Sequence, residues 1–252
     1  MLVPLVVFDL DGTLVDTAPD LVATLNVILA REGLPPVAYD AARNMVGGGA
    51  RVMIERGLAA QVGPARLAHD HAKPGQARVS DGRKVATPAV DKLVKDFIEH
   101  YAAHIADQSR PFPGLEAALD DLEAGGCRLA VCTNKLEWLA VRLLDALGLS
   151  KRFVAICGGD TFGLQKPHPE LLHRSIARCE GRVEQAVMIG DSISDIAMAK
   201  AAGVPVIAVT YGYTETPVGE LGPDRVIDAC RDLPRVVFDL LGNDMAARAT
   251  PR

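Results

Sequence analysis

The sequence predicts an α/β protein, in which a parallel sheet carries helices on both faces and an α-helical cap domain is inserted into the chain. Three observations predict this class. Short apolar runs of strand length recur along the chain. Segments with helical periodicity lie between the later runs, as in βαβ units. The first two runs are about 120 residues apart, which is far more than one crossover needs.

The first strand is expected over Leu5–Leu10, near the end of an almost continuous apolar run. The run is far shorter than the roughly 18 residues of a membrane span. It also lacks the basic segment and the small-residue cleavage site of a signal peptide. We therefore interpret it as a buried strand and not as a targeting segment.

The cap domain is expected to occupy residues 17–110. Residues 19–31 carry their apolar side chains on one stripe, and Leu93–Ile105 repeats that pattern, so two amphipathic helices are predicted. The segment Pro111–Gly114 is rich in proline and glycine and marks the return to the sheet.

One stretch inside the cap, His69–Pro88, is polar and has no period. We expect a flexible surface insertion there. His69 and His71 have no third metal ligand nearby in the sequence. They are interpreted as solvated surface residues.

The core domain is expected to combine residues 1–16 with 111–240, followed by a frayed tail at 241–252. Residues 116–124 and 194–202 each show a helical pattern that stops at glycine. A further helix could begin at Pro169. The later strands are expected at Leu129–Cys132, Val154–Cys157, Ala186–Ile189 and Pro205–Val209.

Composition limits the function. The chain has 252 residues, 49% of them hydrophobic, so it can bury a sizeable core. The net charge of −5 and the absence of a Lys/Arg-rich block argue against nucleic acid or an anionic membrane as the main partner. The five cysteines show no metal-ligand spacing and are interpreted as reduced packing residues of a cytoplasmic protein.

Polar side chains follow the predicted strands, where an open parallel sheet has its ligand crevice. Any one of them alone is explained equally well as a helix cap or turn residue. Their convergence on one edge of the sheet is better explained by a site. The set consists of Asp9, Asp11, Thr133, Asn134, Lys166, Asp191 and Asp195.

The chemistry that such a set can perform is phosphoryl transfer. Clustered carboxylates repel one another and a phosphate, so they require a divalent cation, and all-oxygen ligands favour Mg²⁺. One aspartate could then attack phosphorus, while a second moves the proton of the leaving group and of water. Thr133 could offer its hydroxyl and backbone N–H to phosphoryl oxygens.

The motifs "DLDGTLVD", "VCTN", "QKPHP" and "GDSISD" resemble, in this order, the four signature motifs of the haloacid dehalogenase-like hydrolase superfamily. The resemblance implies a Rossmann-like core, Asp9 as nucleophile and Asp11 as general acid/base. It implies that Thr133 and Lys166 hold the phosphoryl group, with Asn134 beside them. The implied Mg²⁺ ligands are Asp9, Asp11 through its main-chain carbonyl, and Asp191, supported by Asp195.

Further local signals, "DTAPDL", "VGGGA", "PFPG", "TNK" and "GVPVIAVTYGY", are similar to one bacterial branch of that superfamily. They imply a small phosphorylated carboxylic acid as substrate. His168 departs from the pattern, because the third motif more often has Asp there, and this could alter contacts around Lys166.

The glycine cluster Gly47–Gly49, followed by Arg51, is the most suggestive cap feature. Free glycine N–H groups could bind the substrate carboxylate, helped by Arg51. A simple helix-ending turn explains the glycines equally well, and Arg51 could be a surface charge. Tyr211 and Tyr213 either face the crevice or pack at the sheet edge.

Rival functions remain open at this point. A phospho-receiver signalling module also uses an aspartate, Thr, Lys and Mg²⁺, but its acidic pair precedes a separate phosphoacceptor and its chain is about half as long. No motif excludes a catalytically silent binding protein. The nearest competitors are a phosphosugar phosphatase and a phosphohexose mutase of the same superfamily.

Overall fold

The computed structural model describes residues 3–62, 76–78, 84–86, 90–214 and 216–242. Its core is a six-stranded parallel sheet with strand order β10-β9-β8-β1-β6-β7. The strands are β1 (Leu5–Phe8), β6 (Arg128–Cys132), β7 (Phe153–Cys157), β8 (Ala186–Gly190), β9 (Val206–Val209) and β10 (Arg225–Ile227).

The central strand β1 pairs with β6 on one side and β8 on the other, with Phe8 level with Val131 and Ile189. After β1 the chain forms β6 and β7 on one side of β1, and then β8, β9 and β10 on the other. The strand order therefore reverses at β1, and the carboxyl end of β1 is where an open α/β sheet forms its crevice.

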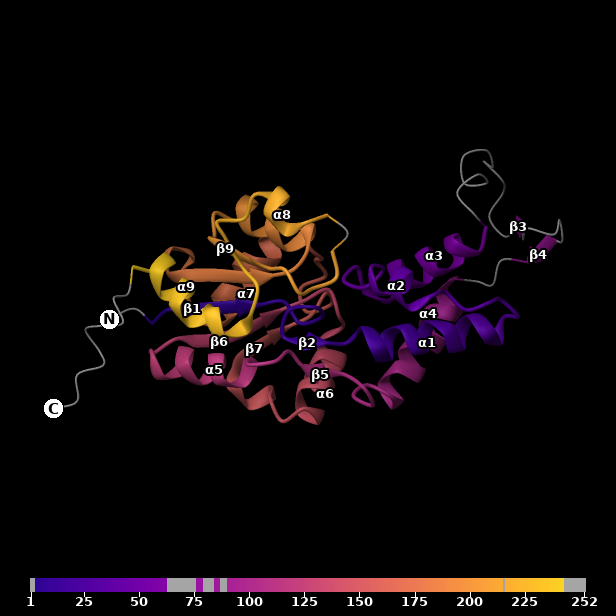
Figure 1. Cartoon of the computed structure of the whole chain (residues 1–252), viewed down its shortest axis with the longest axis horizontal. Helices are drawn as coiled ribbons and strands as arrows, with labels where there is room; N and C mark the ends of the chain where they lie inside the picture. The colour runs from indigo at the N-terminus through magenta and orange to yellow at the C-terminus, as the bar shows by residue number, and fades with distance from the viewer. Residues whose placement is uncertain (1–2, 63–75, 79–83, 87–89, 215, 243–252) are drawn as a thin grey trace.

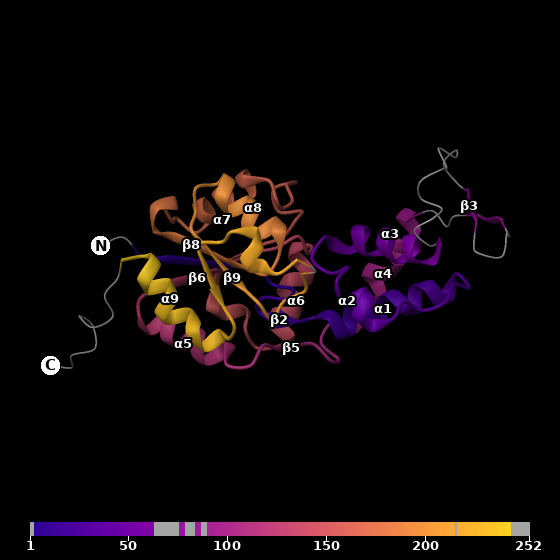
Figure 2. The same ribbon diagram turned by 45° about the horizontal axis from the view of Figure 1, so that its top comes forward.

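Helices cover both faces of the sheet, which confirms the predicted class (Figures 1 and 2). One face packs against α5 (Leu115–Ala124), α6 (Glu137–Ala146) and α9 (Leu233–Leu240), and the other against α7 (Pro169–Arg178) and α8 (Ile193–Ala201). Alternate strand residues serve the two cores: Val6 and Phe8 face the first, and Leu5 and Val7 the second. All these strand side chains are fully buried.

The inserted cap domain is helical, with α1 (Ala18–Arg31), α2 (Tyr39–Arg43), α3 (Gly49–Val62) and α4 (Val90–Ala103). These helices lie together beyond one end of the sheet (Figure 1). Helix α4 packs on both α1 and α3. The two amphipathic helices predicted at 19–31 and 93–105 are therefore present, and the second begins and ends two or three residues earlier than expected.

Two short strands, β2 (Val15–Asp16) and β5 (Arg110–Pro111), pair antiparallel where the chain leaves and re-enters the core. They coincide with the predicted division at residues 16–17 and 110–111, although the domain boundaries themselves stay a prediction. In the predicted insertion at 69–88, β3 (Gln76–Arg78) pairs antiparallel with β4 (Lys84–Ala86). His69, His71, the rest of that insertion and most of the predicted tail lie outside the described residues.

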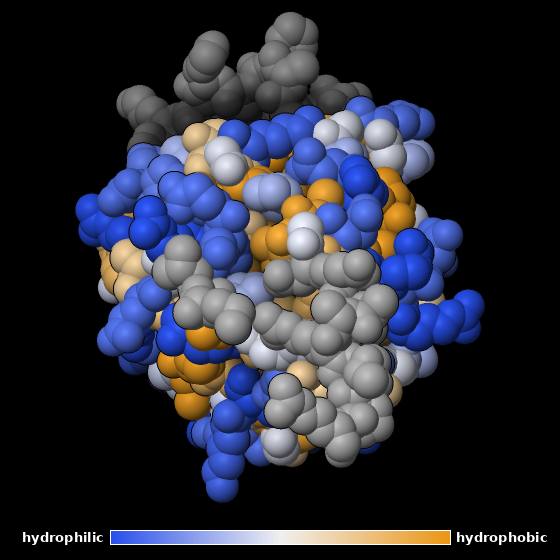
Figure 3. All heavy atoms as spheres, turned by 90° about the vertical axis from the view of Figure 1, so that its left-hand side faces the viewer, coloured by the Kyte–Doolittle hydropathy of each residue, from blue (hydrophilic) through white to orange (hydrophobic). Residues whose placement is uncertain are grey.

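The end of the core opposite the cap presents a mixed surface in which hydrophilic side chains predominate (Figure 3). No helix in the described part of the chain has the length and apolar character needed to cross a bilayer. All five cysteines are buried, as expected for packing residues.

Candidate functional site

The loop after β1 places two aspartates at the centre of the sheet edge. The Asp9 N–H donates to the Ile189 carbonyl and so prolongs the ladder by one residue. The chain then turns sharply at Gly12, whose φ is +84° and whose Cβ position lies 2.4 Å from Asp191 Oδ2. Because a side chain here would be strained and would collide with that carboxylate, glycine allows the loop to pack directly on Asp191.

Lys166 links two buried carboxylates. Its Nζ lies 2.6 Å from Asp9 Oδ1 and 2.7 Å from Asp195 Oδ1. Burial alone would lower the pKa of Lys166, but Asp195 and Asp9 together raise it above its ordinary value. Burial raises the pKa of Asp9 to about 7, against the lowering effect of Lys166. The lysine is thus held charged between its two partners.

Carboxylate oxygens of Asp9, Asp191 and Asp195 lie within 4.8 Å of one another, and all three residues are buried. Burial, followed by the charges of Asp195 and Asp9, raises the pKa of Asp191 well above its ordinary value. Three carboxylates and one ammonium leave an excess of negative charge in a buried site. These residues fit a divalent cation with oxygen ligands.

Asp191 is oriented from two directions. The Tyr213 N–H donates to Asp191 Oδ2 at 2.7 Å, and the Thr13 hydroxyl donates to Oδ1 at 3.3 Å. The Tyr213 hydroxyl donates to Asp16 and accepts from the Ala18 N–H, at the start of the cap. Tyr213 therefore connects Asp191 to the start of the cap while its ring packs in the core. Tyr211 packs on the Phe112 ring, with centroids 4.5 Å apart, so both predicted alternatives are partly met.

The Asp11 carboxylate points away from this cluster. It accepts from the Thr17 hydroxyl at 2.7 Å and lies 3.0 Å from Lys135 Nζ. Its predicted contribution to the metal is through the main-chain carbonyl, and the side chain does not join the three clustered carboxylates. Lys135 was not among the predicted site residues, although the quoted "TNK" motif contains it.

Thr133 and Asn134 stand at the end of β6, as predicted. The predicted binding of phosphoryl oxygens by Thr133 stays a prediction, and it falls to the hydroxyl. The Thr133 N–H donates to the Cys157 carbonyl at 3.0 Å. This N–H therefore takes part in the pairing between β6 and β7. The Asn134 side chain accepts from the Lys166 N–H and donates to the Gly47 carbonyl, so it ties the core to the cap.

A pocket of about 240 Å³ lies between cap and core. Its lining includes Gly47–Gly49 and Tyr101 from the cap, and Asp11, Asn134 and Lys135 from the core. Arg51 also lines it, but the guanidinium pairs with Asp91, and about half of the side chain is exposed. The structure therefore brings the glycines to the predicted site and turns the charged group of Arg51 towards another cap helix.

His168 caps helix α7. Its Nδ1 accepts from the Glu170 N–H at 3.2 Å, and Pro169 occupies the first helical position. The departure from the family motif therefore supplies a helix cap in the loop that carries Lys166.

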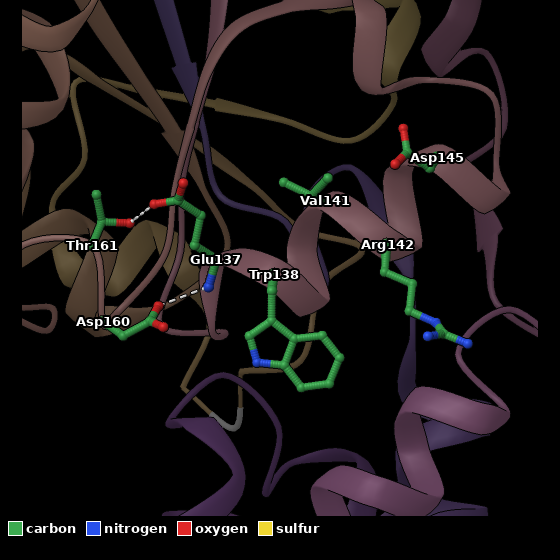
Figure 4. A pocket seen from close by; sticks show the side chains of 7 residues that line it. All are labelled: Glu137, Trp138, Val141, Arg142, Asp145, Asp160 and Thr161. Carbon is green, nitrogen blue, oxygen red and sulfur yellow. Dashed lines mark hydrogen bonds between the residues drawn. The ribbon is translucent and has the colours of Figure 1, made fainter.

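A larger hollow of about 750 Å³ lies on the outer side of α6 (Figure 4). Glu137 and Thr161 point toward each other there, and Asp160 accepts from the Glu137 N–H. None of the residues lining this hollow belongs to the carboxylate cluster, and we assign no function to it.

Comparison with known proteins agrees with this geometry. A family model described as haloacid dehalogenase-like hydrolase matches residues 6–209. The chain is 45% identical to phosphoglycolate phosphatase of Agrobacterium fabrum, over 98% of this chain and 97% of that protein. It is 47% identical to the Caulobacter vibrioides enzyme of the same name, over 94% and 91%. A crystal structure of a predicted phosphoglycolate phosphatase from Haemophilus somnus superposes with a TM-score of 0.78, at 28% identity and covering 93% and 97% of the two chains.

Proposed function

The chain belongs to the haloacid dehalogenase-like hydrolase family, and on that premise we propose that it is a Mg²⁺-dependent phosphatase that hydrolyses 2-phosphoglycolate to glycolate and phosphate. Relatives named phosphoglycolate phosphatase match nearly its whole length and support this substrate. The short motifs that resemble one bacterial branch of the family point to these same phosphoglycolate phosphatases.

The observation that carries the proposal is the position of Asp9 at the crevice of the sheet, paired with Lys166 and close to Asp191 and Asp195. In the proposed reaction Asp9 Oδ attacks phosphorus, and the bond from phosphorus to the glycolate oxygen breaks as an aspartyl-phosphate forms. Asp11 gives a proton to the leaving oxygen. It then takes one from the water that attacks the aspartyl-phosphate, which restores Asp9.

Two residues would hold the transferred group during these steps. Lys166 offers a positive charge within the buried cluster, and the Thr133 hydroxyl stands at the neighbouring strand end. Fixed donors and charges of this kind stabilise the developing charge on phosphoryl oxygens, because they need no reorganisation.

Mg²⁺ would be held by the carboxylates of Asp9 and Asp191 and the main-chain carbonyl of Asp11, with Asp195 supporting the cluster through Lys166. The bound ion would offset the carboxylate charges and polarise the phosphoryl oxygens. The three clustered carboxylates support a divalent cation, and their oxygen chemistry favours Mg²⁺.

The substrate's carboxylate would lie in the pocket between cap and core, against the backbone of Gly47–Gly49. Helix α3 begins at Gly49, and the first N–H groups of a helix have no acceptor within it. Such groups favour an anion. Arg51 would have to break its ion pair with Asp91 to bind the carboxylate, so we assign the glycine N–H groups a larger role than Arg51.

A substrate panel tests the proposal. Purified protein with Mg²⁺ should hydrolyse 2-phosphoglycolate with a higher kcat/KM than hexose phosphates, and EDTA should abolish the rate. A preference for hexose phosphates would indicate the sugar-phosphate phosphatase instead. A requirement for a bisphosphate activator would indicate a mutase, and no turnover of any phosphate ester would indicate a binding protein.

We also propose that the protein works in the cytoplasm. The thiols of Cys132, Cys157, Cys179 and Cys230 are free and buried, which suits a reducing compartment. Oxidised protein with disulfides, isolated from cells without exposure to air, would contradict this.

A further inference from the structure

Lys135 is a buried cation that the mechanism above does not use. Only about 5% of its side chain is exposed, and it follows Thr133 by two residues at the end of β6. Charged side chains are rarely buried to this degree unless they are paired or have a function. Its contacts show which parts of the molecule its charge connects.

The Lys135 ammonium lies between the core and the cap. From the core, Asp11 Oδ1 is 3.0 Å from Nζ. From helix α4 of the cap, the Tyr101 hydroxyl is 3.3 Å away, and the centre of the Tyr101 ring is 4.6 Å away. A lysine ammonium carries three N–H donors, and these contacts give it two hydrogen-bonding partners among the described residues. The third donor can serve a ligand.

The charged residues that line the pocket around Lys135 indicate which kind of ligand would bind there. Two cations line it, Lys135 and Arg51. Each of them pairs with an aspartate, Arg51 with Asp91 and Lys135 with Asp11. Arg51 is half exposed, so solvent screens its charge, whereas Lys135 is buried and its charge acts more strongly at close range. A carboxylate that enters this pocket therefore needs Lys135 as its counter-charge.

The position of Lys135 relative to the phosphoryl-binding residues fits a short substrate. Thr133 and Lys135 are two residues apart, so their Cα atoms are separated by at most about 7 Å. In 2-phosphoglycolate a single methylene carbon separates the phosphate ester oxygen from the carboxylate, so the two charged ends of the substrate also lie close together. Its phosphate could lie at Thr133 and Lys166 while its carboxylate reaches Lys135.

We propose that Lys135, together with the Tyr101 hydroxyl, binds the carboxylate of the substrate and so selects phosphorylated carboxylic acids. This inference rests on the proposed function and names the residues that give it specificity. Tyr101 belongs to the cap, so the carboxylate would be held by both domains at once. Its binding energy would then favour the arrangement in which the cap lies over Asp9.

The test compares two substrates that differ in the carboxylate. One is 2-phosphoglycolate and the other is 2-hydroxyethyl phosphate, which has a two-carbon alkoxide leaving group and no carboxylate. The wild-type protein should prefer the first in kcat/KM by about 100-fold or more, the scale of a buried charge pair. In Lys135→Met this preference should fall to within a few-fold of unity. Lys200→Met, on the surface of α8, is the control and should keep the wild-type preference.

An unchanged preference in Lys135→Met would overturn the inference, because a lysine that only positions Asp11 affects both substrates alike. A wild-type protein without any preference would instead refute the proposed function. If Lys135→Met does not fold, Tyr101→Phe decides. It keeps the ring and removes the hydroxyl, and it should lower the preference about tenfold.

Inhibition by the two products gives a second measurement on the same variants. With 2-hydroxyethyl phosphate as substrate, the inhibition constant for glycolate should rise at least tenfold in Lys135→Met, and that for phosphate should change much less. Equal changes for the two products would count against a carboxylate site at Lys135.

Discussion

The cluster at the end of β1 and the pocket under the cap face the same space, but they are held in different ways. The four residues of the cluster, Asp9, Lys166, Asp191 and Asp195, are almost completely buried. Asp9, Lys166 and Asp191 come from the loops after β1, β7 and β8, and Asp195 from the first turn of α8. Ion pairs through Lys166 and hydrogen bonds from the neighbouring loop fix them.

The cap side depends on fewer polar contacts. Asn134 bonds to the Gly47 carbonyl, Lys135 to the Tyr101 hydroxyl, and Arg43 to two carbonyls of the loop after β9. A packed sheet is difficult to displace, whereas a few polar contacts between domains can form and break. We therefore expect the cluster to perform the proposed chemistry on any phosphate ester, and the contacts of Lys135 and Tyr101 at the pocket to select among esters.

The largest expected effect is that of Asp9→Asn. An amide is a far weaker nucleophile than a carboxylate, so turnover should be lost for every substrate. Initial rates with saturating Mg²⁺ measure this, and Asp160→Asn, at an exposed aspartate outside the cluster, is the matched control. More than a small residual rate in the Asp9 variant would remove Asp9 from the role of nucleophile.

The second effect is that of Asp11→Asn. Loss of proton transfer to the leaving oxygen should lower kcat by about 10²- to 10⁴-fold. The loss should be smaller for an aryl phosphate, because its leaving group is stable without a proton. Rates that fall equally for alkyl and aryl esters would speak against an acid/base role for Asp11.

The third effect concerns the metal. Asp191→Asn replaces one of the clustered carboxylates, and the Mg²⁺ concentration for half-maximal rate should rise at least about tenfold. A titration of the rate with Mg²⁺ after treatment with EDTA measures the shift. If the half-maximal concentration stays the same, Asp191 has a structural role only.

The same contrast between core and cap explains which strands, helices and site residues could be predicted from the sequence. The runs around β1 and β8 are long, apolar and followed by aspartates, so both the strands and the site residues were predictable. Strand β10, with three residues, and the two-residue strands β2 and β5 are too short to show any period. Helix α3 was missed because its apolar stripe is weak and Gly57 interrupts it.

The cap contacts could not be predicted for a different reason. A lysine after "TN" looks like a surface residue of a loop, and only the fold brings Tyr101, 34 residues earlier, next to the Lys135 Nζ.

Gly48 shows why a substitution at the glycines is a weak test of carboxylate binding. A Cβ there would lie 2.8 Å from Val52 Cγ1, so Gly48→Val would disturb α3 for every substrate. It is therefore a poor test of carboxylate binding, and Lys135→Met is the better one.

A fourth prediction tests whether the cap contacts act on all substrates. Arg43 donates to the carbonyls of Tyr211 and Gly212 at 3.1 and 3.0 Å, and its guanidinium carbon lies 5.0 Å from the centre of the Tyr213 ring. Arg43→Gln removes a charge-assisted contact between cap and core without touching the pocket. The kcat/KM should fall by about tenfold for 2-phosphoglycolate and 2-hydroxyethyl phosphate alike. A loss confined to one substrate would place Arg43 in carboxylate recognition.

The smallest expected effect lies behind the cluster, in the helix that carries Asp195. Ser192 and Asp195 form a capping box at the start of α8: the Ser192 hydroxyl accepts from the Asp195 N–H, and Asp195 Oδ2 accepts from the Ser192 N–H at 3.1 Å. Ser192→Ala removes half of this box and should lower the free energy of unfolding by about 1 kcal/mol. For a chain of this size that is a fall of roughly 2–4 °C in Tm, which calorimetry can measure.

Activity should change little in Ser192→Ala, because Lys166 still holds Asp195 Oδ1 from the other side. Ile193→Ala, at an exposed side chain in the first turn of α8, is the control and should leave Tm within about 1 °C of wild type, the usual range for a surface change. A large loss of activity at unchanged Tm would mean that the capping box, and not the ion pair with Lys166, positions Asp195. The position of Asp195 would then depend on the start of α8, just as the shape of the pocket depends on the position of the cap.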